Sequence, residues 1–236
     1  MADDMSEDSV FDKVQEHQAR DIIDESLKFQ WRYTTLRNDY QDLKNIHEVN
    51  IRHSTERTEQ LETQGYVFEV ERRLHHYLSG LYTLLQQQNT LQNGVAQSFS
   101  RDLQAVKSEY MSKESSRTVL GLRHYIQHEN VLPLKPRTSK LERTKSLVIL
   151  VEDLHRQDGD KDFEQHFGHL PKPYFDPVKW VKDDWPDVEQ FFQDSVEVIL
   201  EQTEDEIDKL QHLRGEVAEL YEEVADDYRE FHSESD

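Results

Sequence analysis

Two residues of this sequence have the types and spacing of a catalytic pair: Arg123 and His128, which are separated by four residues. They lie in the run RHYIQH, which we call the motif. A guanidinium donates two parallel hydrogen bonds to a phosphate and stabilises the charge of a phosphorane. An imidazole exchanges protons near neutral pH and suits general acid or base catalysis. His124, next to the arginine, would orient one of these groups or contact phosphate. The catalytic candidates are therefore Arg123, His124 and His128.

The flanking residues predict that the motif lies in the last turns of a helix. Ser115 and Ser116 can accept hydrogen bonds from the unpaired N–H groups of a helix start. Apolar residues then recur at helical spacing: Val119, Leu122 and Ile126. Pro133 cannot continue the helix. On a regular helix, positions five apart point about 140° away from each other, which argues against a compact Arg123–His128 site within one chain.

Two other roles for the motif stay open. In a purely structural role, Arg123 pairs with a carboxylate and the two histidines act as cations at the negative end of the helix. In a metal site, His124 and His128 have the four-residue spacing of metal ligands, but Tyr125 stands where a zinc protease would have glutamate. We therefore predict no metal and no cofactor.

Composition excludes several classes of protein. The chain has 236 residues, 28 Lys and Arg, and 49 Asp and Glu, giving a net charge of −21. The absence of cysteine excludes disulfides and thiolate metal sites. No apolar run is long enough to span a membrane, and the acidic start does not resemble a signal peptide. We expect a cytoplasmic protein without membrane contact, and its acidity suggests a halophilic source.

The charge is unevenly distributed along the chain. Positions 101–145 contain ten Lys and Arg and five Asp and Glu, whereas positions 183–236 contain three basic residues and twenty acids. The basic segment contains the motif, which suggests contact with a polyanion there. The candidate RNA-binding residues are Arg117, Lys135, Arg137 and Lys113. The alternative is that these basic residues form an ordinary solvated face.

Periodicity predicts a mainly α chain that forms a single domain over 1–236. We expect a disordered tail over 1–8, core helices with the motif over 9–135, a hairpin and loop insertion over 136–182, and a long acidic helix over 183–232. The core helices are expected at about 10–25, 27–62 (one or two helices), 66–91 and 97–112, with a break or a tight contact at Gly65. Matching apolar stripes predict mutual burial of Leu74, Leu78, Leu81, Leu122 and Ile126.

The later part of the chain combines short and long elements. Positions 131–142 and 144–151 predict a small β-hairpin, with a helix over 140–155 as the competing interpretation. We expect loops over 156–182. The last helix would start at Asp183, with Pro186 in its first turn.

The chain resembles the HEPN superfamily (higher eukaryotes and prokaryotes nucleotide-binding), helical proteins that often act as RNases. The hallmark of that superfamily is a short motif near the end of a helix. It consists of an arginine, a polar residue directly after it, and a histidine that follows the arginine after four to six intervening residues. Arg123, His124 and His128 fit this motif. The run ERRLHHYLSG from Glu71 to Gly80 also looks like the first core helix of bacterial members. The resemblance covers roughly residues 27–135.

The resemblance implies a metal-independent endoribonuclease of the toxin–antitoxin or antiviral defence type. His128 would act as acid or base while the 2′-OH attacks the phosphate, and Arg123 would stabilise the phosphate, leaving a 2′,3′-cyclic phosphate and a 5′-hydroxyl. Family members pair their motif helices, so the resemblance implies a homodimer with a composite cleft, and an antitoxin or nucleotidyltransferase partner. The alternatives are a non-catalytic RNA- or nucleotide-binding regulatory protein, and a helical assembly scaffold.

Overall fold

The computed structural model describes residues 18–53, 60–94, 97–129, 131–139, 144–155, 160–170 and 173–233, and most of these are helical. The elements are α2 (Gln18–His53), α3 (Gln60–Gly94), α4 (Gln97–Ser112), α5 (Glu114–Glu129), β1 (Leu134–Ser139), β2 (Thr144–Leu150), the 3-10 helix η1 (Val151–His155), α6 (Asp160–Phe167), β3 (Tyr174–Phe175) and α7 (Pro177–Ser233). The prediction of a mainly α chain is confirmed.

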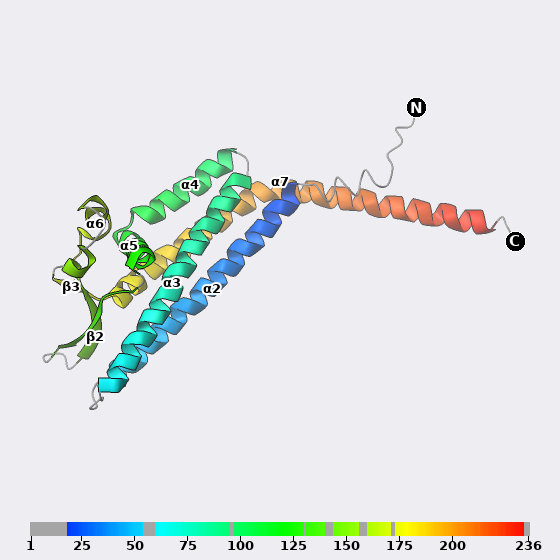
Figure 1. The fold of residues 1–236 in the computed structure, drawn as a ribbon. Coiled ribbons are helices and arrows are strands. Elements are labelled where there is room, and N and C mark those ends of the chain that lie inside the picture. Colours follow the sequence, from blue (N-terminus) through cyan, green and yellow to red (C-terminus); the bar gives the residue numbers. More distant parts are fainter. Residues whose placement is uncertain are drawn as a thin grey trace.

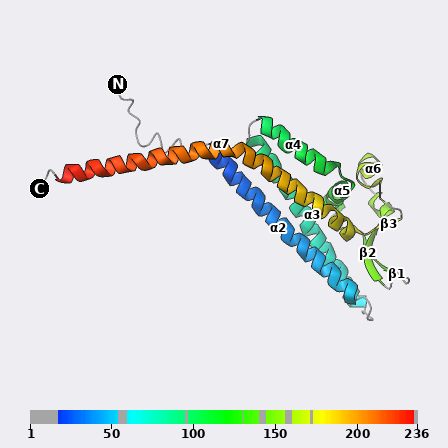
Figure 2. The ribbon, with the colours of Figure 1, turned by 180° about the vertical axis from the view of Figure 1, so that it is seen from behind.

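Three long helices form the body of the molecule. Helices α2 and α3 pair along most of their length, and the first half of α7 lies against α2, α4 and α5 (Figure 1). Seen from behind, α7 runs between α2 and α4 (Figure 2). Helix α5, which carries the motif, contacts α3, α4, α6 and α7. The motif helix is therefore held on several sides by the bundle.

A small antiparallel sheet packs at the end of the bundle where α7 begins. Its strand order is β1-β2-β3, with Pro136 opposite Leu147 and Ile149 opposite both Leu134 and Phe175. The predicted hairpin is confirmed, and the competing helix over 140–155 is wrong at 144–150. Pro136 is tolerated because β1 is an edge strand, where a missing N–H need not break a ladder.

The predicted core is confirmed at every position named. The five residues expected to be buried together are between 0% and 5% exposed: Leu74, Leu78, Leu81, Leu122 and Ile126. Gly80 allows α2 to approach α3 closely, since a Cβ there would lie 3.3 Å from Leu36 Cδ1. Both predictions for Gly65 were wrong: α3 continues through it, so there is no break, and nothing lies within 4 Å of an added Cβ, so there is no tight contact.

Several predicted helix boundaries were wrong. Residues 18–53 form one helix across the expected boundary between 25 and 27, and the predicted start near residue 10 lies outside the described residues. Helix α7 begins at Pro177, not at Asp183, because the Asp176 carboxylate Oδ1 accepts hydrogen bonds from the N–H groups of Val178 (2.9 Å) and Lys179 (3.1 Å). Aspartate before proline is an N-terminal helix signal.

The interval 156–182 also contains more structure than the predicted loops. Helix α6 occupies Asp160–Phe167 within it, and β3 follows at Tyr174–Phe175. Phe163 and Phe167 of α6 are both buried, one turn apart. Among the described residues, no helix has the length and apolar character needed to cross a membrane.

Candidate functional site

A cavity of about 410 Å³ lies beside the motif. It is lined from α3 by Tyr82, Leu85 and Gln86, from α4 by Lys107 and Met111, from α5 by Leu120, Arg123, His124 and Gln127, and from α6 by Gln165 and His166. We call this cavity the motif pocket. Its polar lining consists of cations, imidazoles, amides and one phenol, with no carboxylate among the described residues that line it. Such a lining favours an anionic ligand.

Arg123 is held in the pocket by an aromatic contact. Its Cζ lies 4.9 Å from the centre of the Tyr82 ring, within the range of a cation–π interaction. Its Nε is buried and has no hydrogen-bond partner within the described part of the chain, nor does Arg123 form an ion pair there. A buried N–H without a partner is costly, by about 1–3 kcal/mol. The structural role of pairing Arg123 with a carboxylate finds no support among these residues.

Lys107 adds a second cation. Its Nζ donates to Asn89 Oδ1 at 2.6 Å and to the Leu85 carbonyl at 3.4 Å. Burial lowers the pKa of Lys107, because removing the ammonium from water disfavours its charged form. An anion bound in the pocket would compensate for that loss of hydration.

Three histidines lie close together at the pocket. The His124 ring centre is 4.5 Å from that of His128 and 6.5 Å from that of His166. His124 and His166 line the pocket, whereas His128 is exposed and is not among its lining residues. The predicted pair of Arg123 and His128 is thus not brought together in this cavity. Arg123 and His124 are, and His166 joins them.

His166 is oriented by a backbone carbonyl. Its Nδ1 lies 3.0 Å from the Arg117 carbonyl oxygen. A carbonyl can only accept, so Nδ1 carries the proton and, in the neutral ring, Nε2 keeps a free lone pair. This tautomer, assigned from the hydrogen bond, is the one a general base needs. Sequence reasoning missed His166 because its segment was interpreted as a loop; the four-residue spacing of Phe163 and Phe167 was the available helical signal.

Gly121 allows α6 to reach the motif helix. A Cβ at position 121 would lie 2.5 Å from His166 Cβ and 2.8 Å from Phe167 Cζ. No side chain fits into that space without moving α6. Gly121 therefore sets the distance of His166 from the motif.

The start of α5 is fixed to α7 by hydroxyl–carboxylate hydrogen bonds. Ser116 Oγ and Tyr110 OH donate to the two oxygens of Asp184 at 2.7 and 3.0 Å, and Ser115 Oγ donates to Asp187 at 3.2 Å. The predicted capping role of the two serines is thus replaced by contacts between helices. Burial raises the pKa of Asp184 to about 7. Asp184 is thus a buried junction of α4, α5 and α7.

The predicted RNA-binding residues of β1 do not line the motif pocket. Lys135 Nζ pairs with Asp153 Oδ2 at 2.6 Å. Arg137 is exposed, and its Cζ lies 3.6 Å from the centre of the Tyr174 ring. Both stay candidates for backbone contacts with RNA, but at the sheet and not in the pocket.

The other two candidates lie near the start of α5. Lys113 is exposed and pairs with Glu109 at 3.8 Å. The Arg117 carbonyl oxygen is hydrogen-bonded to His166. The side-chain Nε of Arg117 is buried and has no hydrogen-bond partner within the described ranges. Arg117 thus orients a residue of the pocket without lining the pocket itself.

Within the described ranges, no three His, Asp or Glu side chains lie close enough together to hold a metal ion.

Comparison of the chain with protein-family models, with curated proteins and with solved structures finds no match. The resemblance to the HEPN superfamily therefore stays a prediction based on the motif. The geometry of the motif pocket is an independent basis for a functional proposal.

Proposed function

We propose that the protein is a metal-independent endoribonuclease that binds a phosphodiester of RNA in the motif pocket. The observation that carries this proposal is the convergence of Arg123, His124 and His166 on one cavity, with 6.5 Å between the two imidazole centres. A donor and an acceptor of protons must each come within about 3 Å of a reacting oxygen. Two imidazoles at this separation can reach the attacking 2′-oxygen and the leaving 5′-oxygen of one phosphodiester.

The proposed reaction uses the 2′-hydroxyl of the RNA as nucleophile. His166 Nε2 takes the hydroxyl proton, and the 2′-oxygen forms a bond to phosphorus. The bond from phosphorus to the 5′-oxygen breaks, and that oxygen takes a proton from His124. The products are a 2′,3′-cyclic phosphate and a 5′-hydroxyl.

His128 keeps an acid–base role in this scheme, but it acts on His124 and not directly on the phosphate. Its ring contacts that of His124 and is exposed to solvent. It would exchange protons between water and His124 and restore the acid after each turnover.

Two cations would stabilise the phosphate as its charge develops. Arg123 lines the pocket, and its guanidinium would donate hydrogen bonds to the phosphate oxygens. Lys107 contributes a positive charge from the facing helix. Charge stabilisation of this kind is often the largest contribution to catalysis.

The biological context is part of the proposal, supported by the family resemblance alone. It comprises a cytoplasmic toxin or antiviral defence role, an antitoxin or nucleotidyltransferase partner, and a homodimer with facing motif helices. A halophilic source agrees with the net charge of −21.

One observation favours an alternative of binding without catalysis. Three glutamines, Gln86, Gln127 and Gln165, line the same pocket. Side-chain amides donate and accept hydrogen bonds, which suits the edges of nucleobases. In this alternative the pocket would hold a nucleotide and the histidines would contact its phosphate.

Incubation of the purified protein with RNA in EDTA tests the proposal. We expect cleavage that leaves cyclic phosphate ends, and a loss of about 10²–10⁴-fold in rate for His166→Ala. His212→Ala, on an exposed position of α7, is the matched control and should keep full activity. Nucleotide binding without cleavage would support the alternative, and cleavage only with a divalent metal would refute the proposed mechanism.

A further inference from the structure

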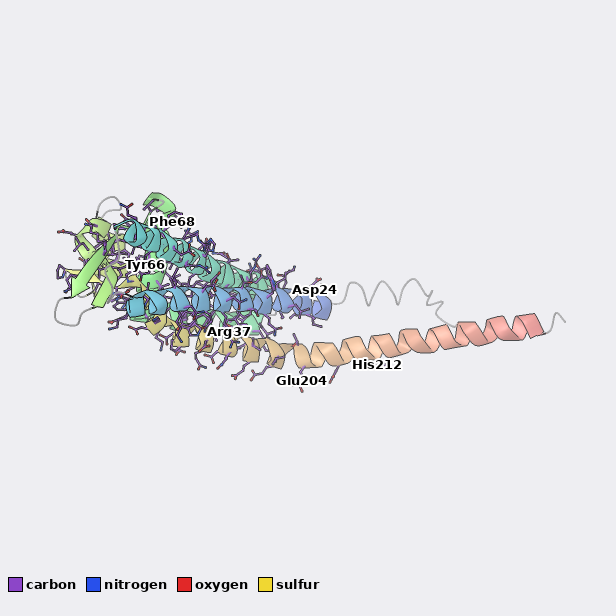
Figure 3. All side chains as sticks on the ribbon, turned by 90° about the horizontal axis from the view of Figure 1, so that it is seen from below. Asp24, Arg37, Tyr66, Phe68, Glu204 and His212 are labelled. Atoms are coloured by element: carbon purple, nitrogen blue, oxygen red, sulfur yellow. The ribbon has the colours of Figure 1, made fainter. Side chains whose placement is uncertain are left out.

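The second half of α7 extends well beyond the helical bundle (Figures 1 and 2). Glu204 and His212 mark its course in Figure 3, and both are exposed. We call residues 204–233 the tail. At a rise of 1.5 Å per residue it is roughly 45 Å long, and no other described element lies beside it.

The sequence of the tail has a seven-residue repeat. One set of positions, d, holds Thr203, Leu210, Val217, Val224 and Phe231, and the other, a, holds Leu200, Ile207, Arg214, Tyr221 and Tyr228. Only Thr203 and Arg214 depart from an apolar or aromatic residue in these sets. A repeat sustained over four heptads is typical of a helix that pairs with another helix in a coiled coil.

The repeat continues the surface by which α7 packs against α2. Thr203 is buried, and Val196 lines a groove of about 280 Å³ between the two helices. Leu200 and Leu27 border that groove and are 59% and 58% exposed. Apolar surface is thus already open to solvent where the tail leaves the bundle. The start of the tail therefore offers a partner helix an apolar surface.

The arrangement of charge along the repeat favours a second copy of this chain as the partner. Of the twelve acids between 201 and 233, nine occupy the outer positions b, c and f. The positions that flank a coiled-coil seam include Leu213, Ala218, Leu220 and Ala225. A basic partner helix would be recognised by acids at the flanking positions. Here only three of the nine flanking positions from 204 to 232 carry acids (Glu204, Glu206 and Asp227), and Arg214 is the one charged residue at the a and d positions, so two identical tails bring few like charges together.

We propose that the tails of two copies of this chain pair as a coiled coil. The pairing buries the a and d positions and covers the apolar surface around Leu200. The acids on the outer faces still repel one another at longer range, and salt screens that repulsion, with a Debye length of about 10 Å at 0.1 M and 3 Å at 1 M. Association should therefore strengthen as KCl is raised. This assembly does not depend on the activity of the motif pocket.

Sedimentation of the full-length protein across a KCl series tests this proposal. We expect a dimer at high salt, and Leu210→Glu combined with Val217→Glu should weaken association at least 10-fold. Gln202→Glu combined with Ser233→Glu adds the same charge at outer positions and should leave the dimer intact. Circular dichroism checks that both variants remain folded. A monomer throughout the series, or a dimer unaffected by the first pair of substitutions, would overturn the proposal.

Discussion

Gly121 on α5 and His166 on α6 are in such close contact that an added Cβ at position 121 would overlap the histidine, at 2.5 Å from its Cβ. The contact fixes where the His166 ring stands relative to His124 and Arg123. A glycine with no catalytic group thus acts as a positioning residue for the proposed site.

Gly121→Ala should reduce RNA cleavage by displacing α6. A misplacement of about 1 Å at a catalytic group can cost about 10²-fold in rate. We expect a lower kcat with little change in KM, measured with a fluorescent oligonucleotide, because the phosphate-binding cations stay in place. Gly65→Ala is the control: nothing lies within 4 Å of its added Cβ, so activity should be unchanged. Normal kcat in Gly121→Ala would show that His166 does not need its present position.

Mixing two inactive variants distinguishes a pocket within one chain from a composite site. Arg123 and His166 line the same cavity of one chain. A mixture of Arg123→Ala and His166→Ala protein should therefore remain inactive, since every chain lacks one of the two groups. Recovery of a substantial part of the activity after the chains exchange would instead show that each site draws on two chains. The rate of each variant alone is the baseline.

Asp184→Asn should stabilise the fold at pH 8 and have little effect near pH 4. The folded-state pKa of Asp184 is about 7, against an ordinary value of 3.8, because burial disfavours the carboxylate. Folded protein therefore binds more protons than unfolded protein between these values, and stability falls as pH rises through them. At about 1.4 kcal/mol per pKa unit, the penalty at pH 8 is on the order of 4 kcal/mol.

Urea unfolding of Asp184→Asn at a series of pH values measures this effect. Asp183→Asn, at the exposed neighbouring position, is the control and should show no such trend. An asparagine variant that is less stable than the parent at pH 8 would mean that the Ser116 and Tyr110 hydrogen bonds outweigh the cost of burying the charge.

Leu78→Ala should destabilise the protein by about 2–5 kcal/mol, the range for removing a buried leucine side chain. Leu78 is 1% exposed, on α3 in the core of the bundle. The matched control is Leu27→Ala, since Leu27 is 58% exposed and its truncation should change the free energy of unfolding by less than about 0.5 kcal/mol. Chemical denaturation of both variants makes the comparison. Equal losses would contradict the packing described here.

Elements with long apolar periodicity could be predicted from the sequence. The stripe through Leu74, Leu78 and Leu81 marks α3 as a buried helix, and the β-branched run before Leu150 marks β2. Such patterns reflect burial on one face, which local sequence records directly. The start of the last helix was harder to predict, because two places have the same signal of an acid before a proline. Asp176 precedes Pro177, and acids also precede Pro186. Both places carry the same kind of local signal, and in the structure the Asp176 carboxylate caps the helix, which therefore begins at Pro177.

The site was only partly predictable for a related reason. Arg123 could be found from its spacing to His128, and His124 from its place beside Arg123; Arg123 and His124 line the pocket. Lys107 and His166 come from other helices, and their convergence depends on how α4 and α6 pack against α5. The contact of Gly121 with His166 spans 45 positions of sequence, and no local pattern encodes it.

The continuity of α7 from Pro177 to Ser233 has a mechanical consequence. A flexible tether lets the domains it joins sample many separations, and their effective concentration falls as the tether lengthens. A single continuous helix is instead rigid. A partner that binds its far end therefore also fixes the distance and direction of the bundle relative to that partner. Ser116 and Tyr110 bond to Asp184 near the other end of this rod. The spacing between any two bundles joined through their tails is therefore dictated by helix length.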